Sequence, residues 1–115
     1  MTLEMTTLEP SAPDVISTDD AQMIARFFQV LGDPTRVRIV KALADAEWCV
    51  SDLKDALGMD QPAVSHQLKT LRDMELVSWQ KKGRHVYYRL ADTHLRDMLI
   101  SSIAHIAHVK DDHTA

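Results

Sequence analysis

Residues 50–71 read VSDLKDALGMDQPAVSHQLKTL, and this stretch decides the fold. The letters before Gly58 predict a short helix, because Leu53, Ala56 and Leu57 recur at helical spacing and face inward. Gly58 itself suits the left-handed conformation that ends many helices. The residues from Pro62 onward predict a second helix. Two helices joined by so short a turn predict a helix-turn-helix.

The second of these helices has one apolar side and one polar side. Its apolar stripe repeats at i, i+4 and i+7 and consists of Val64, Leu68 and Leu71. At 100° per residue, the polar side chains that point away from this stripe are Ser65, His66, Lys69 and Thr70. Ser65 and His66 can hydrogen-bond base edges in the major groove. Lys69 and the backbone N–H groups near Gln61 can bind phosphates.

A basic hairpin follows this helix. After Leu76 the apolar period changes from helical spacing to two, which predicts two strands joined by the tight turn KKGR. Gly83 suits the positive φ that such a turn needs. Lys81, Lys82 and Arg84 place cations at the tip, within reach of phosphates or the adjacent minor groove. This order of helices, turn and hairpin predicts a winged helix-turn-helix.

Helices are also predicted on both sides of this unit. The first begins with a cap at Thr18 or Asp19 and ends at Gly32. The last runs from Asp92 to about Val109 and is apolar nearly all round, so it needs burial on more than one side. In a chain of 115 residues, a partner subunit can provide that burial. The predicted fold class is mainly α (α+β), a winged helix-turn-helix with N- and C-terminal dimerisation helices.

Charge is distributed unevenly along the chain. The net charge is −4, yet residues 1–20 hold five acidic residues and no Lys or Arg, while residues 61–89 hold six basic and two acidic residues. A local basic segment can bind phosphate even in an acidic protein. The N-terminal residues show little periodicity. We therefore predict a disordered N-terminal arm (1–17), a DNA-binding and dimerisation domain (18–110) and a C-terminal tail (111–115).

Composition also bears on where the protein works. A single cysteine, Cys49, excludes an internal disulfide framework and favours a reducing compartment. The first ten residues contain no basic residue and no apolar core, so we expect no secretory signal. The apolar runs are too short to span a bilayer. These features predict a cytoplasmic protein with no membrane partner.

The last predicted helix carries an unusual group of polar residues. They interrupt an otherwise apolar segment and are Asp92, His94, His105 and His108. The three histidines fall within a sector of about 60° on a helical projection. Burying several imidazoles without partners is unfavourable, and a bound metal ion removes that penalty. The alternative is that Asp92 caps the helix, His94 lies at the surface, and the other two histidines favour the helix C-terminus.

The separation of these residues predicts where a metal site would form. Asp92 and His105 are 13 residues apart, which is about 19 Å along a helix axis. Metal–ligand bonds are near 2 Å. One helix therefore carries two half-sites, Asp92 with His94 and His105 with His108. Antiparallel pairing of two such helices brings unlike half-sites together, and a two-fold axis makes two identical sites per dimer.

Over roughly residues 20–110 the chain resembles the ArsR/SmtB family of small dimeric metal-responsive repressors. The resemblance is carried by LGDPTRVRIVKALADAEWCVSDL and QPAVSHQLKTLRDMELV, and VSHQLKTL is especially similar to that family's recognition helix. It implies that the base-reading stretch lies in or near Gln61, Ser65, His66 and Gln67. Helical rotation places Gln67 at the edge of the inner stripe.

The same resemblance extends to the metal residues. The spacing D-x-H-x10-H-x2-H is similar to the C-terminal-helix site of zinc-sensing members, with matches at Asp92, His94, His105 and His108. Three nitrogens and one oxygen suit tetrahedral Zn²⁺, and Co²⁺ fits the same set. The stretch WCVSDL departs from arsenic, cadmium and lead sensors, because Ser51 stands where they carry a second cysteine. We therefore interpret Cys49 as a buried or half-buried residue and not a ligand.

Pattern and resemblance together predict a metal-responsive transcriptional repressor. A metal-free homodimer binds double-stranded operator DNA, and zinc at the C-terminal helices weakens that binding and derepresses metal-homeostasis genes. One alternative is a nickel- or cobalt-responsive repressor that uses Asp111, Asp112 and His113 as extra ligands. Another is a metal-independent winged-helix DNA-binding protein. A metalloenzyme is disfavoured, because a four-ligand site leaves no open position for water.

Overall fold

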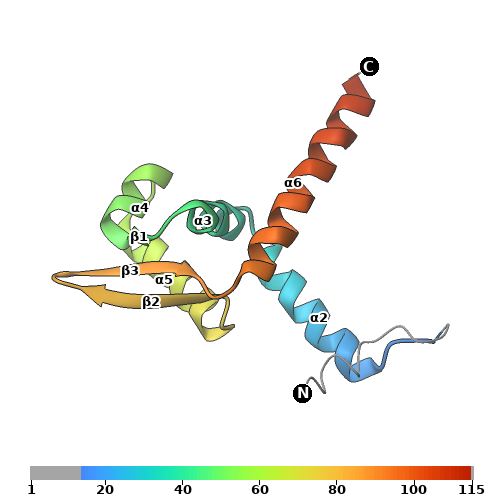
Figure 1. The fold of residues 1–115 in the computed structure, drawn as a ribbon, viewed down its shortest axis with the longest axis horizontal. Helices are drawn as coiled ribbons and strands as arrows, with labels where there is room; N and C mark the ends of the chain where they lie inside the picture. The colour runs from blue at the N-terminus through green and yellow to red at the C-terminus, as the bar shows by residue number, and fades with distance from the viewer. Residues whose placement is uncertain (1–13, 115) are drawn as a thin grey trace.

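The computed structural model describes residues 14–114 and confirms the predicted winged helix-turn-helix (Figure 1). Its elements are, in order, α2 (Thr18–Leu31), α3 (Pro34–Asp45), β1 (Trp48–Cys49), α4 (Val50–Leu57), α5 (Gln61–Asp73), β2 (Val77–Lys82), β3 (His85–Leu90) and α6 (Thr93–Thr114). The helix-turn-helix and the hairpin form one half of the molecule, and α2 and α6 extend away from it (Figure 1).

The helix-turn-helix consists of α4, α5 and the three residues between them. Gly58 ends α4 with a φ of 68°, as predicted, and its N–H donates a hydrogen bond to the Asp55 carbonyl. Asp60 caps α5, because its Oδ1 accepts a 2.8 Å hydrogen bond from the Ala63 N–H. Pro62 lies in the first turn, where its missing N–H has no intrahelical partner to lose. Local residues therefore set both ends of the turn.

The predicted hairpin forms the wing. β2 and β3 pair antiparallel along their whole length, and Gly83 adopts a φ of 65° at the turn. A third strand, β1, pairs with β3 and places Trp48 opposite Tyr88, so that the sheet order is β1-β3-β2. The sequence did not predict β1, because an alternating pattern cannot be recognised in two residues.

The apolar core lies between α3, the helix-turn-helix, the wing and the start of α6. It contains Ile39, Val40, Leu43, Leu53, Val64, Leu68, Leu71, Val77 and Leu95. By contrast, α2 contributes no buried residue, and residues 96–111 of α6 are half-buried or exposed. Both long helices therefore leave apolar surface uncovered in one protomer.

Two local expectations are wrong. Ser17 caps α2 instead of Thr18 or Asp19, because the Ser17 backbone is extended and its Oγ accepts a 3.1 Å hydrogen bond from the Asp20 N–H. Ala56 is exposed and not inward, since α4 directs its leucine side chains to the core. Neither difference changes the order of the elements.

The last helix is longer than predicted. α6 continues to Thr114 instead of ending near Val109, because no Gly or Pro interrupts it. The segment proposed as a tail, 111–115, is therefore helical as far as the structure describes it. Of the proposed arm, 1–17, only residues 14–17 lie within the described residues, and they form no helix or strand. Among the described helices, none is both long and apolar enough to cross a membrane.

Candidate DNA interface and metal half-sites

The polar side of α5 is open to solvent near the start of the helix. Gln61 is the first residue of α5, and Ser65 and His66 are exposed one turn later. Thr70 Oγ1 donates a 3.3 Å hydrogen bond to the His66 carbonyl, so this hydroxyl serves the helix backbone. The opposite side of the helix is in the core. The exposed side thus presents the groups predicted to contact bases.

Two other α5 residues predicted to bind DNA have partners within the protomer. Lys69 Nζ lies 2.9 Å from Asp73 Oδ2 in an exposed pair, which is weak enough for a phosphate to replace the carboxylate. Gln67 is half-buried, and its Oε1 accepts a 2.9 Å hydrogen bond from Arg36 Nε. Gln67 is therefore directed towards α3.

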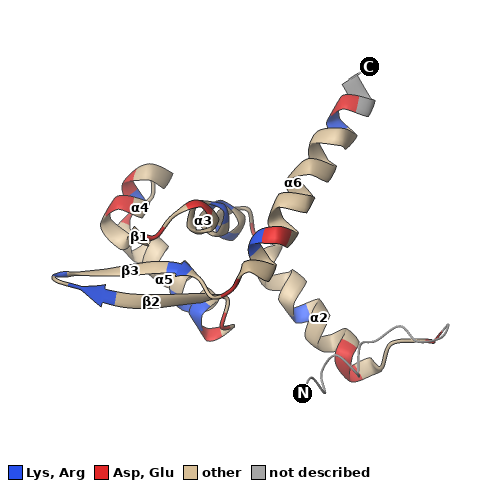
Figure 2. Ribbon diagram, in the orientation of Figure 1, with Lys and Arg blue, Asp and Glu red and all other residues tan. Residues whose placement is uncertain are grey.

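The tip of the wing is basic (Figure 2). Lys81, Lys82 and Arg84 are all exposed there. Lys82 Nζ also lies 2.7 Å from Glu47 Oε1 and 5.4 Å from the centre of the Tyr87 ring. The hydrogen bond from Lys82 holds the pKa of Glu47 below its ordinary value of 4.5. No sequence signal predicted this pair, because its residues are 35 positions apart.

Asp92 and His94 lie together at the start of α6. His94 Nδ1 is 3.6 Å from Asp92 Oδ1. Asp92 also caps the helix, since Oδ1 accepts hydrogen bonds from the N–H groups of His94 at 2.9 Å and Leu95 at 3.4 Å. Capping and metal binding are compatible, because a carboxylate has two oxygens with several lone pairs. The His94 side chain is 89% exposed and therefore accessible to a partner.

His105 and His108 lie one turn apart towards the other end of α6, and both are exposed. Within the part of the chain that the structure describes, no group of three or more candidate metal ligands comes together. One protomer therefore carries the residues of the two half-sites separately and does not assemble all four.

Cys49 is buried, with 4% of its surface exposed, where β1 meets α4. The prediction of a buried residue is thus confirmed. Ser51, which follows it on α4, is exposed. A buried free thiol is typical of a cysteine that packs as a small hydrophobic residue.

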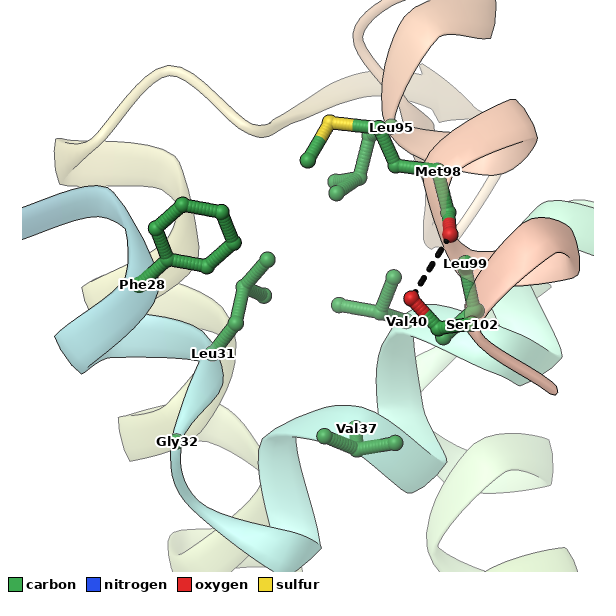
Figure 3. A pocket seen from close by; sticks show the side chains of 9 residues that line it. All are labelled: Phe28, Leu31, Gly32, Val37, Val40, Leu95, Met98, Leu99 and Ser102. Atoms are coloured by element: carbon green, nitrogen blue, oxygen red, sulfur yellow. Dashed lines mark hydrogen bonds between the residues drawn. The ribbon is translucent and has the colours of Figure 1, made fainter. Parts of the chain in front are cut away.

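An apolar cavity of about 350 Å³ lies between α2, α3 and α6 (Figure 3). Phe28 from α2, Val37 from α3 and Met98 from α6 line it. A second apolar groove follows α3 and α6 past Ile103 and Ile106, which are 45% and 53% exposed. A continuous apolar surface of this kind is typical of a protein–protein contact.

The chain is similar to known bacterial regulatory proteins. The family described as "Bacterial regulatory protein, arsR family" matches residues 33–78. A "Transcriptional repressor SmtB homolog" from Synechocystis is 49% identical over 86 residues, which is 75% of this chain and 65%, just under two thirds, of that protein. The "HTH-type transcriptional regulator NmtR" from Mycobacterium tuberculosis is 40% identical over 87% of this chain and 82% of NmtR. The chain belongs to the ArsR/SmtB family.

ArsR/SmtB proteins are metal-sensing transcriptional repressors, and the matched relatives are named as regulators and not as enzymes, in line with the sequence prediction. The solution structure of apo-NmtR superposes with a TM-score of 0.72. The homodimeric winged helix-turn-helix DNA-binding domain Mb0332 from Mycobacterium bovis is 25% identical, with a TM-score of 0.69, over 91% of this chain and 94% of that chain. This ArsR/SmtB protein is therefore a winged-helix DNA-binding regulator.

Proposed function

We propose that this ArsR/SmtB protein is a zinc-responsive repressor whose metal-free homodimer binds operator DNA. Zinc bound between the C-terminal helices of two subunits weakens DNA binding and derepresses metal-homeostasis genes. The arrangement of α6 carries the proposal, because two half-sites lie far apart on one exposed apolar helix. Each half-site lacks the ligands that a second helix can supply.

The exposed apolar face supports the homodimer. Phe28, Ile103 and Ile106 are 56%, 45% and 53% exposed in a single protomer. Complete burial of such a side chain contributes roughly 1.5–3 kcal/mol. The related Mb0332 domain is described as homodimeric. A two-fold pairing covers the same face on both subunits at once.

The donor set supports zinc. Asp92 with His94 from one subunit, and His105 with His108 from the other, give three nitrogens and one oxygen. This is a closed four-coordinate set of the kind that zinc prefers in non-catalytic sites. Asp92 and His94 have side chains that are 60% and 89% exposed, so a partner helix can reach them.

The two DNA-binding elements support operator recognition. Ser65 and His66 present hydrogen-bonding groups to base edges, while Lys69 and the wing tip provide phosphate contacts. Two symmetry-related α5 helices fit consecutive major grooves only when they lie roughly 34 Å apart. A metal that favours another dimer geometry disfavours DNA binding, and DNA disfavours the metal equally. A DNA target and a buried free thiol at Cys49 favour a cytoplasmic location.

A metal titration tests the proposal. Chelator-treated protein is bound to a labelled operator duplex and titrated with Zn²⁺, Co²⁺, Ni²⁺ and Cd²⁺. Zinc should reduce operator affinity by about tenfold or more, which is 1.4 kcal/mol of coupling. Asp92→Ala should abolish the response, whereas Asp97→Ala, which removes a neighbouring exposed acid on α6, should preserve it. If no metal weakens binding, the proposal fails.

One observation favours a second candidate, a nickel- or cobalt-responsive repressor. Because α6 continues to Thr114, Asp111, Asp112 and His113 lie on the same helix as His108 and about one turn beyond it. Additional donors raise the coordination number towards six, which suits Ni²⁺ and Co²⁺. The Co²⁺-loaded protein distinguishes the two candidates. Intense visible bands that persist in His113→Ala indicate the four-ligand site, and weak bands indicate six ligands.

A further inference from the structure

Arg36 joins three helices. Its Nη1 donates a 3.0 Å hydrogen bond to the Val30 carbonyl in the last turn of α2, and its Nε donates a 2.9 Å hydrogen bond to Gln67 Oε1 on α5. Arg36 itself lies in the first turn of α3, where its N–H is held by Asp33 Oδ2 at 3.0 Å. One guanidinium therefore connects α2, a long and largely exposed helix, to α5, the second helix of the helix-turn-helix.

The bond to Val30 attaches the end of α2. The last four carbonyls of a helix have no intrahelical partner, and a cation near them is favourable. α2 contributes no fully buried residue, and its apolar contact with the core is limited to the half-buried Phe27, Val30 and Leu31. A directional hydrogen bond at its last turn is therefore a significant part of its attachment to α3.

The bond to Gln67 restricts rotation of α5. The buried stripe Val64, Leu68 and Leu71 holds the helix against the core, but apolar contacts are non-directional. The hydrogen bond between Gln67 and Arg36 depends on orientation. Gln67 follows His66 directly, so a rotation of α5 that moves His66 in a DNA groove also strains this bond.

We propose that Arg36 is a positioning residue that sets the orientation of α5 relative to α2, and that it transmits metal-induced movement of the dimer helices to the recognition helix. The transmission of metal-induced movement rests on the proposed function, whereas the positioning of α5 does not. Arginine suits this role because its planar fork directs several N–H groups to separate acceptors, while lysine has one nitrogen. Gln67 then influences DNA binding through Arg36 and not by reading bases.

A double-mutant cycle on metal-free dimers tests the positioning role. Arg36→Lys keeps the charge but leaves one nitrogen for two acceptors, and Gln67→Met removes the acceptor at similar length. Each change should lower operator affinity about tenfold, with affinity for a random duplex altered by less than about twofold. The double variant should bind no more weakly than the weaker single variant, because both changes remove one bond. Arg38→Lys, the same change at an exposed position of α3, is the matched control.

Two results would overturn this role. Losses that add to about 100-fold in the double variant show that Gln67 contacts DNA independently of Arg36. A lower thermal midpoint with unchanged preference for the operator shows that Arg36 only stabilises the fold. If Arg36→Lys does not fold, Gln67→Glu replaces it, because a carboxylate still accepts from Arg36. Gln67→Glu should keep the operator preference that Gln67→Met loses, and equal losses contradict the proposal.

Zinc separates the coupling role from the proposed function. Arg36→Lys should bind zinc as tightly as the wild type, yet its operator affinity should fall less when zinc is added. A full zinc response in Arg36→Lys overturns the coupling role. If zinc does not weaken operator binding by the wild-type protein, the proposed function is overturned. The double-mutant cycle on metal-free dimers still decides the positioning role in that case.

Discussion

Lys82 Nζ lies 2.7 Å from Glu47 Oε1, so an acid that precedes β1 pairs with a cation of the wing tip. Arg89 on β3 is near the same carboxylate, with 3.9 Å between Nη1 and Oε2. These side chains are substantially exposed, so the pairs contribute little to the stability of the fold. We expect their larger effect to be electrostatic, because Glu47 offsets the charge of cations that are predicted to face DNA phosphates.

Glu47→Gln should therefore strengthen binding to random duplex DNA. Without the carboxylate, Lys82 is available to a phosphate, and each additional phosphate contact changes the slope of log K against log salt by about −0.9. Affinities measured at several salt concentrations should give a slope steeper by about one unit. Asp45→Asn removes an exposed acid that pairs with Lys41 and is the matched control. An equal change of the salt slope in both variants would show that the effect comes from net charge alone.

The same pair predicts a pH dependence of the wing. Lys82, by hydrogen bond and charge, holds the pKa of Glu47 below 4.5. A carboxyl group whose pKa is lowered on folding stabilises the folded arrangement above its ordinary pKa, and this contribution disappears as pH falls through the lowered value. The ion pair should therefore be intact at neutral pH and be lost only below pH 4.5. NMR titration of the Glu47 carboxyl carbon should show a higher midpoint in Lys82→Met; identical midpoints would contradict the prediction.

Exposure of His66 on α5 predicts a role in sequence recognition. His66→Ala should lower operator affinity by about 1–3 kcal/mol, the usual contribution of a specific base contact, and leave affinity for random DNA nearly unchanged. Lys69→Gln should weaken binding to both duplexes, because phosphate contacts carry no sequence information. Competition between operator and random duplexes for each variant gives the ratio of its affinities for the two kinds of DNA. The same loss on both duplexes for His66→Ala would exclude base reading.

Local signals were sufficient to predict the helix-turn-helix. Gly58 and Gly83 adopt the positive φ expected at a helix end and in a tight turn, and the alternating pattern after Leu76 predicts both wing strands. The separation of Asp92 and His94 from His105 and His108 along α6 also follows from spacing alone, since the rise of a helix is fixed. Each of these features depends on residues within a few turns of one another.

Features that join distant segments were not predictable in this way. Arg36 and Gln67 are 31 positions apart, and Glu47 and Lys82 are 35 apart. Periodicity placed Gln67 at the edge of the inner stripe but did not reveal the guanidinium opposite it. The family resemblance implied that Gln67 belongs to the base-reading stretch. In the fold, however, its side-chain oxygen Oε1 is directed to Arg36 on α3. Only tertiary packing determines such partners.

Burial of Cys49 predicts that its effects on stability and on metal sensing are separate. Cys49→Ser places a hydroxyl where 4% of the residue is exposed, so the free energy of unfolding should fall by roughly 1–3 kcal/mol. Zinc-driven operator release should be retained, because the proposed ligands lie on α6. Thermal unfolding and the operator titration measure the two effects. Loss of the zinc response in a folded Cys49→Ser protein would show that α6 alone does not form the site.

The two half-sites predict that two inactive variants restore each other. One variant lacks Asp92 and His94, and the other lacks His105 and His108, so neither homodimer has a complete site. Neither variant alone should bind zinc tightly or release DNA. In a heterodimer, one site receives all four ligands and the other receives none. Random subunit exchange makes about half of the dimers heterodimers.

Mixing the two variants should therefore restore tight zinc binding to about one ion per two dimers, together with partial release of the operator. Mass-tagged chains measure exchange independently of metal binding. A site within one subunit would stay inactive on mixing, because each chain still lacks two of its ligands. Confirmed exchange without recovered zinc binding would therefore exclude the intersubunit site, whereas one ion per two dimers is the stoichiometry expected when each ion is held by two chains.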